Sequence, residues 1–129
     1  MAVYNSFDLF IIRNQYHLTR ADWDVISEKY ELSEDMMRLF QTKLNWRNIA
    51  QHQELSIDFI KEFINYNLKE YINVICKYQK LNEDFIDEYK NILDWGLILE
   101  YQDVSTNFIL NHAEDIKNFK DNSWDEVDH

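Results

Sequence analysis

"WRNIAQHQELSIDFI" at residues 46–60 and "WGLILEYQDVSTNFI" at residues 95–109 follow one formula. Counted from the tryptophan, both have Ile at offset 3, Gln at 7, Leu or Val at 9, Ser at 10, Phe at 13 and Ile at 14. Two more stretches keep most of these residue types, one beginning at Trp23 and the other at Ile72. The chain therefore contains four tandem repeats, which begin 23, 26 and 23 residues apart and decide the fold.

Each repeat predicts two short helices, because each contains two residues suited to cap a helix N-terminus, except the third, where Tyr71 precedes Ile72. The first set stands at offset 10 and comprises Ser33, Ser56, Asn82 and Ser105. The second set stands directly before the tryptophan-type position and comprises Asp22, Asn45, Asp94 and, in a truncated last copy, Ser123. We expect about eight or nine residues in the first helix and about eleven or more in the second, so that each repeat forms an αα-hairpin.

The repeat also predicts the core. Offsets 0, 3 and 7 lie on one face of the first helix, and offsets 13, 14 and 17 lie on one face of the second. We therefore expect the tryptophans to be buried, rather than to stack on nucleic-acid bases. The residues at offset 17 are Phe40, Phe63, Tyr89 and His112. The histidine predicts a more exposed face in the last repeat, as in the terminal repeat of a solenoid.

The predicted fold is all-α, with stacked αα-hairpin repeats that form a short helical solenoid. One domain covers residues 1–129, with an N-terminal helix at about 3–18, repeats at about 19–44, 45–70, 71–93 and 94–120, and an acidic tail at 121–129. The composition agrees, with one Gly, no Pro and 46% hydrophobic residues. Tight β-hairpins and phosphate-binding loops usually need glycines, whereas packed helices do not.

The charge of the chain restricts its partners. Thirteen basic and 24 acidic residues give a formal net charge of -11. This charge repels phosphate backbones, so we expect no direct nucleic-acid binding and instead a protein partner with a basic surface. The single cysteine excludes an internal disulfide, and no stretch approaches the ~18 apolar residues of a membrane span. The N-terminal stretch lacks the basic segment of a signal peptide, and we expect a cytoplasmic protein without membrane association.

No residue pattern predicts catalysis, a cofactor or a metal site. The chain contains no phosphate-binding loop, no Gly-x-Ser-x-Gly motif and no His-Glu-x-x-His motif. His112 and Asp115 fall on one helical face in "HAED" (112–115), but a metal ion needs more than two ligands, and we interpret them as a surface pair. Cys76 adjoins a core position and is interpreted as a buried, unreactive thiol.

Glutamine recurs at offset 7 in three repeats, as Gln53, Gln79 and Gln102. We interpret this glutamine as structural, because an amide near the turn between two helices can bond a free carbonyl and a free N–H together. The paired acids after the caps, Glu34–Asp35 and Glu83–Asp84, favour the positive end of a helix dipole. None of these residues requires a catalytic role, and we do not expect an enzyme.

The formula resembles tandem helical repeats in uncharacterised proteins of bacteriophages and large DNA viruses. The resemblance covers about residues 20–113, and its clearest copies are "WRNIAQHQELSIDFI" and "INVICKYQKLNEDFI". The first repeat departs from the pattern, with Met36 and Met37 in place of Phe-Ile and Tyr30 in place of Gln. The resemblance implies a viral or mobile-element origin, a place in the host cytoplasm and a partner-binding role, and it implies no catalytic residues.

Stacked hairpins place equivalent turns along one edge, where acidic residues accumulate. We call this set the acidic ridge: Glu31, Glu34, Asp35, Glu54, Asp58, Glu83, Asp84 and Asp103. The ridge, the small size and the viral-type repeat give the hypothesis of a phage-encoded inhibitor that binds a host nucleic-acid-binding defence protein, of the anti-CRISPR or anti-restriction type. The alternative is a structural or scaffolding protein that self-assembles through exposed ends of the solenoid, which leaves a homo-oligomer open.

Overall fold

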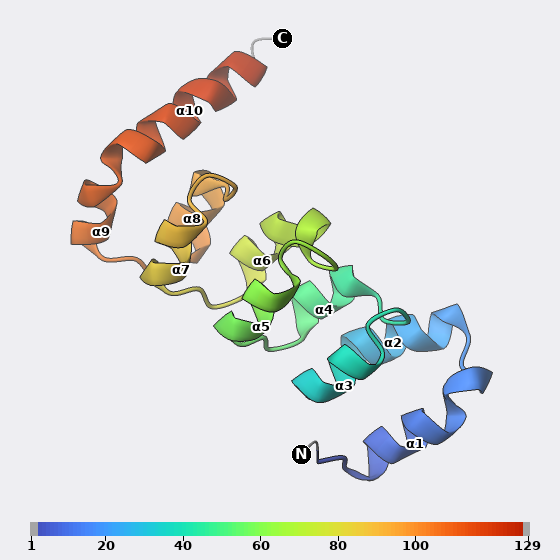
Figure 1. The fold of residues 1–129 in the computed structure, drawn as a ribbon. Coiled ribbons are helices and arrows are strands. Elements are labelled where there is room, and N and C mark those ends of the chain that lie inside the picture. Colours follow the sequence, from blue (N-terminus) through green and yellow to red (C-terminus); the bar gives the residue numbers. More distant parts are fainter. Residues whose placement is uncertain (1–2, 128–129) are drawn as a thin grey trace. The chain divides into compact units, whose positions relative to one another are not determined.

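The computed structural model describes residues 3–127, with side chains described for residues 3–120. In this part of the chain all regular structure is helical and no strand is present, which confirms the all-α prediction (Figure 1). The elements, with η for a 3-10 helix, are α1 (Ser6–Asn14), η1 (Gln15–His17), α2 (Arg20–Lys29), α3 (Glu34–Leu39), α4 (Trp46–His52), α5 (Ile57–Phe63), η2 (Lys69–Tyr71), α6 (Ile72–Tyr78), α7 (Glu83–Glu88), α8 (Trp95–Tyr101), α9 (Thr106–Asn111) and α10 (Ala113–Val127).

Side-chain caps explain where these short helices begin. At offset 10 of every repeat, the side-chain oxygen accepts from the backbone N–H three residues further on, at 2.8–3.1 Å. Asn45 and Asp94 cap α4 and α8 in the same way, so these predicted caps are confirmed. The prediction is wrong for Asp22 and Ser123. Thr19 caps α2 three residues before Asp22, which completes the capping box, and Ser123 lies inside α10.

The second helix of each repeat is shorter than the sequence predicts. Helices α3, α5, α7 and α9 contain only six or seven residues each. They end near offset 17, where the N–H of Phe40, for example, bonds back to the carbonyl of Met36 at 3.0 Å. Irregular turns follow, and each of the first three ends close to a buried leucine: Leu44, Leu68 or Leu93. Because these leucines belong to the core, the chain turns inward before the next repeat begins.

The helices form two compact units, Met1–Glu70 (unit 1) and Tyr71–His129 (unit 2). In unit 1, α2 packs against α4, and in unit 2, α6 packs against α8. Helix α10 contacts α8 and α9 within unit 2. The first helices of two consecutive repeats are therefore neighbours within each unit, whereas the continuous solenoid and the single domain stay predictions.

Most of the predicted core positions are buried in both units. Trp23, Trp46 and Trp95 are 3%, 7% and 2% exposed, which confirms that these three tryptophans belong to the core, while Trp124 lies outside the described side chains. The residues at offsets 13 and 14 of the second and third repeats are fully buried: Phe59, Ile60, Phe85 and Ile86.

The chain also contains little backbone strain, because none of the described residues, Gly96 included, has a positive φ. Among the described helices, none combines the length and the apolar character needed to cross a membrane.

Two core positions are exposed, and one position expected to be exposed is buried. Tyr30 is 43% exposed and stacks on Phe7 of α1, with ring centroids 4.2 Å apart. Ile109, at offset 14 of the last repeat, is 36% exposed. His112 is only 9% exposed, so the greater exposure predicted for this face of the last repeat is found at Ile109 and not at offset 17. Its ring centroid lies 4.1 Å from that of Phe108 and 5.5 Å from that of Trp95, so the imidazole fills the place of an aromatic core residue.

Candidate functional site

In each unit, the repeated glutamine of one repeat bonds to the turn of the repeat before it. In unit 1, Gln53 is buried; its Oε1 accepts from the N–H of Leu32 at 3.0 Å, and its Nε2 donates to the carbonyls of Ser27 at 2.9 Å and Tyr30 at 2.6 Å. In unit 2, Gln102 makes the equivalent bonds to Leu81, Cys76 and Gln79, at 2.7–2.9 Å. The structural interpretation of Gln53 and Gln102 is confirmed. These bonds fix the turn between two helices, which is where the acidic ridge lies.

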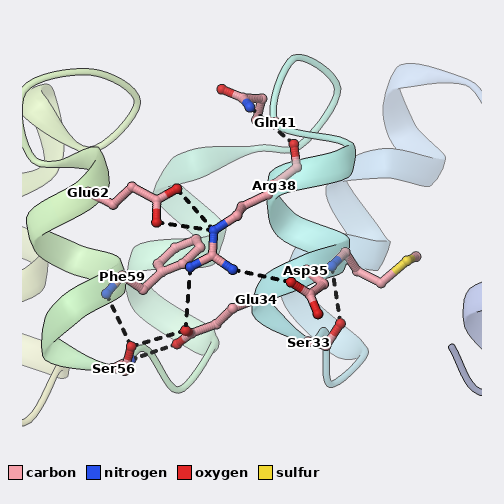
Figure 2. Close-up of polar contacts among 9 residues, drawn as sticks. Ser33, Glu34, Asp35, Arg38, Gln41, Ser56, Phe59 and Glu62 are labelled. Carbon is pink, nitrogen blue, oxygen red and sulfur yellow. Dashed lines mark hydrogen bonds and ion pairs between the residues drawn. The ribbon is translucent and has the colours of Figure 1, made fainter. Parts of the chain in front are cut away.

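Two ridge carboxylates join consecutive repeats. The carboxylate of Glu34 accepts from the backbone N–H of Ser56 at 2.9 Å and from the Ser56 hydroxyl at 3.0 Å (Figure 2). In unit 2, Glu83 accepts from the N–H of Ser105 at 2.7 Å and from its hydroxyl at 3.3 Å. The sequence indicated only a dipole role for these acids. The structure shows that both are half-buried and hold the N-cap residue of the next repeat.

A third ridge residue, Asp35, belongs to a charge cluster around Arg38. Figure 2 shows the guanidinium between α3 and α5, where Nε lies 3.0 and 3.1 Å from the two carboxylate oxygens of Glu62 and Nη1 lies 3.3 Å from Asp35. The hydrogen bond to Glu62 raises the pKa of Arg38 above its ordinary value, and the charges of Glu62, Glu34 and Asp35 add to the rise. This exposed cluster contributes little to stability, since such pairs give about 0–1 kcal/mol. The positive charge of Arg38 partly neutralises the negative charge of Asp35.

The remaining ridge acids are exposed: Glu31, Glu54, Asp58, Asp84 and Asp103. In unit 1 the structure brings Glu31, Glu34 and Glu54 together around a groove of about 330 Å³, whose lining also includes Gln53 and Ser56 but no lysine or arginine. Glu31 and Glu54 stand at offset 8 of their repeats, outside any helix, so neither serves as a cap. Their carboxylates are available to a partner.

Unit 2 has an equivalent groove with a different lining. It measures about 590 Å³, and Glu83 and Asp103 of the ridge contribute to it. Lys77, Tyr78 and Tyr101 also line it, although sequence reasoning gave them no role. The signal that could have identified them is the difference between repeats at offsets 5 and 6, which lie outside the shared formula.

Cys76 is fully buried, as predicted. Burial raises the pKa of its thiol to about 11, despite the backbone N–H of Asp94 against the sulfur. In unit 1 the same offset carries Ser27, whose hydroxyl accepts from the N–H of Asn45 at 2.9 Å. Both side chains therefore hold the cap residue of the next repeat. A protonated, buried thiol is a poor nucleophile.

His112 does not form the predicted surface pair with Asp115. Its Nε2 lies 2.7 Å from Oδ1 of Asp87 on α7, and its Nδ1 lies 2.9 Å from the carbonyl of Phe108. Burial alone would lower the pKa of His112, but the bonds to Asp87 and Phe108 outweigh burial and raise the pKa above its ordinary value. The charge of Asp115, which itself pairs with Lys90 at 3.6 Å, adds to the rise.

We expect unit 2 to lose stability as pH rises. An unfolded histidine has a pKa of about 6.5, so the stabilisation from charged His112 is fully present below about pH 6.5 and is lost as pH rises through the raised folded-state pKa. Thermal unfolding should therefore begin at a lower temperature at about pH 9 than at about pH 6. His112→Phe, which installs the residue type of Phe40 and Phe63, should reduce this difference. An NMR titration that gives His112 an ordinary or lowered pKa would contradict the expectation.

Among residues 3–120, no group of three or more His, Cys, Asp or Glu side chains is arranged to hold a metal ion. Comparison of the chain with protein-family models, with curated proteins and with solved structures finds no match. The candidate site therefore rests on geometry and charge: an acidic groove in unit 1 and a groove of mixed charge in unit 2.

Proposed function

We propose that this chain is a non-enzymatic protein-interaction module, built as a short solenoid of αα-hairpins, that binds a partner with a basic surface through its acidic ridge. The observation that carries the proposal is the unit 1 groove, where Glu31, Glu34 and Glu54 gather without a lining cation. Because Glu34 is engaged with Ser56, Glu31 and Glu54 are the residues that meet the partner. Clustered carboxylates attract basic surfaces and accelerate association.

The partner class that fits this site is a nucleic-acid-binding protein, whose groove for phosphates is lined by lysines and arginines. The net charge of -11 and the likeness of the repeats to those of phages and large DNA viruses support a phage-encoded inhibitor of a host defence protein. An anti-CRISPR or anti-restriction role is the specific form of this proposal. The chain occupies part of such a groove, because its ridge carries fewer charges than duplex DNA, with one charge per ~1.7 Å.

The test reverses the charge of the groove without disturbing the fold. Glu31→Lys/Glu54→Lys should slow association with the partner at least about tenfold, because electrostatic steering is lost. Both residues lie outside the helices, so far-UV circular dichroism should remain that of the wild type. The control is Glu70→Lys/Glu100→Lys, which changes two exposed acids outside the ridge by the same total charge.

The experiment captures proteins from host lysate, identifies them by mass spectrometry and measures association rates at low and high salt. Selective loss of a basic nucleic-acid-binding protein with the groove variant supports the proposal. Equal loss with both variants would show that only net charge matters, and unchanged capture with the groove variant would reject the groove as the interface. Glu62, although exposed, is unsuitable as a control, because it holds Arg38.

A self-assembling structural protein is the second candidate, and exposed apolar residues on α9 favour it. Ile109 is 36% and Leu110 66% exposed, whereas Ile60 and Ile86, at the offset of Ile109, are fully buried. An apolar face of this kind suits a second copy of the chain. Light scattering distinguishes the candidates, since assembly through Ile109 and Leu110 should survive high salt and should be lost in Ile109→Lys/Leu110→Lys.

A further inference from the structure

The two grooves share one scaffold, which makes their linings comparable. In each groove, a glutamine amide forms hydrogen bonds to the backbone of the turn, and a glutamate accepts hydrogen bonds from the serine of the next repeat. Leu32 in unit 1 and Leu81 in unit 2 stand at the same offset and line their respective grooves. Residues outside this scaffold are not needed to form a groove, so their side chains can differ between the units and can determine what each groove binds.

Charge differs between the first and third repeats at two offsets, of which offset 8 lines both grooves and offset 5 lines only the groove of unit 2. At offset 5, Glu28 of the first repeat corresponds to Lys77 of the third, and at offset 8, Glu31 corresponds to Lys80. Unit 2 therefore has two lysines where unit 1 has two glutamates. Within the described part of the chain, neither lysine forms an ion pair with a carboxylate. Glu83, the glutamate that lines the unit 2 groove, is engaged with Ser105.

Two tyrosines complete the unit 2 groove. The ammonium of Lys77 lies 5.4 Å from the ring centroid of Tyr78 and 5.5 Å from that of Tyr101, within cation–π distance of both. The rings hold the lysine at the groove, yet they are 47% and 43% exposed. The groove is not enclosed, and it presents two cations beside two partly exposed aromatic surfaces, with the exposed carboxylate of Asp103 also in its lining.

We propose that the unit 2 groove binds an extended acidic peptide segment of a partner protein. Lys77 and Lys80 receive an aspartate or glutamate side chain of the segment, and Tyr78 and Tyr101 pack against an adjacent apolar or aromatic side chain. An open groove suits a peptide that passes through it, because small-molecule sites usually enclose most of the ligand surface. A nucleic acid fits less well, because its continuous run of phosphates would extend past the two lysines to Asp84 and Asp103, whereas a single acidic side chain of a peptide can contact Lys77 and Lys80 alone.

The experiment measures fluorescence anisotropy of the labelled peptide Gly-Asp-Glu-Trp-Glu-Asp-Gly with the full chain at low salt. We expect binding that Lys77→Glu/Lys80→Glu weakens at least about tenfold, as loss of two charge contacts implies. Lys43→Glu/Lys69→Glu, which alters two exposed lysines outside both grooves by the same charge, should bind as the wild type does. Tyr78→Ala/Tyr101→Ala should also weaken binding, and circular dichroism checks that each variant is folded.

Two further probes separate this proposal from its rivals. Binding of the basic peptide Gly-Lys-Arg-Trp-Arg-Lys-Gly should not be weakened by Lys77→Glu/Lys80→Glu, and oligothymidine should bind the wild type more weakly than the acidic peptide does. NMR shifts on addition of the acidic peptide should concentrate at residues 77–83 and 101–103. The proposal is overturned by no binding up to about 5 mM peptide, by equal weakening in the control variant, or by tighter binding of oligothymidine. The basic-partner proposal is independent, because Glu31 and Glu54 remain intact in the lysine variants.

Discussion

Trp46→Ala is expected to lower the free energy of unfolding of unit 1 by about 3–5 kcal/mol, as truncation of a buried aromatic residue does. The indole is 7% exposed and lies against two phenylalanines, with ring centroids 5.1 Å from Phe63 and 6.1 Å from Phe59. Its Nε1 also donates to the carbonyl of Gln41 at 2.8 Å. Truncation therefore leaves a cavity and removes one of two hydrogen bonds to this carbonyl, which also accepts from Nδ2 of Asn67 at 3.1 Å. Phe59→Ala, at a fully buried site, should have a similar cost.

Chemical denaturation followed by circular dichroism measures this loss, with Trp46→Phe as the matched control. Phenylalanine keeps most of the apolar volume but lacks the indole N–H, so it should cost about 1–2 kcal/mol. An unchanged denaturation midpoint in Trp46→Ala would show that the indole acts at the surface, and the core assignment would then be wrong.

Helix starts could be predicted from the sequence because their causes are local. A serine at offset 10 caps its own helix through an N–H three residues away, and neither partner depends on the rest of the fold. Burial at offsets 0, 3, 13 and 14 follows from helical periodicity alone. The prediction that Asp22 caps α2 was wrong for a local reason as well. Thr19 and Asp22 are both suitable cap residues, and Thr19 becomes the N-cap because the two residues form a capping box.

Contacts between repeats could not be predicted, because local roles already explained the residues that make them. Glu34 suits the first turn of α3, so nothing in the sequence required its bond to Ser56, 22 residues away. The partner of His112 could not be predicted for the same reason. Its Nε2 bonds to Asp87, 25 residues earlier, whereas Asp115 lies only three residues away in the sequence and was the expected partner. Second helices were predicted too long because polar residues after offset 17 are compatible with both a helix and a turn.

The unit 2 groove was missed for a related reason. The repeat formula draws attention to positions that agree, such as Leu81 and Gln102, and these build the scaffold. Lys77 differs from the residues at the same offset in the other repeats, and Tyr78 and Tyr101 share an offset at which the two repeats of unit 1 have no tyrosine. Only the fold shows that the three residues meet at one groove. In a repeat protein, shared positions therefore identify the core, whereas variable positions on the same edge identify candidate binding residues.

Gln53→Ala is expected to destabilise unit 1 by about 2–4 kcal/mol, through lost hydrogen bonds rather than lost volume. The amide serves one N–H, that of Leu32, and two carbonyls, those of Ser27 and Tyr30. Each buried group left without its partner costs about 1–3 kcal/mol, and water entering from the adjoining groove offsets part of the sum. Gln53→Met, which keeps the length of the side chain but makes none of these bonds, should cost nearly as much.

Gln53→Glu distinguishes the bonds from the shape of the side chain. A carboxylate still accepts from the N–H of Leu32, but its second oxygen faces the carbonyls of Ser27 and Tyr30 and has no proton to donate. At neutral pH this variant should be at least as unstable as Gln53→Ala. In mild acid, protonation supplies one donor, so its deficit relative to the wild type at the same pH should shrink. The interpretation would be contradicted if Gln53→Ala lowered the free energy of unfolding by less than about 1 kcal/mol and Gln53→Glu showed no recovery in acid. Gln53 would then not stabilise the fold and would instead be a residue available to a partner in the groove.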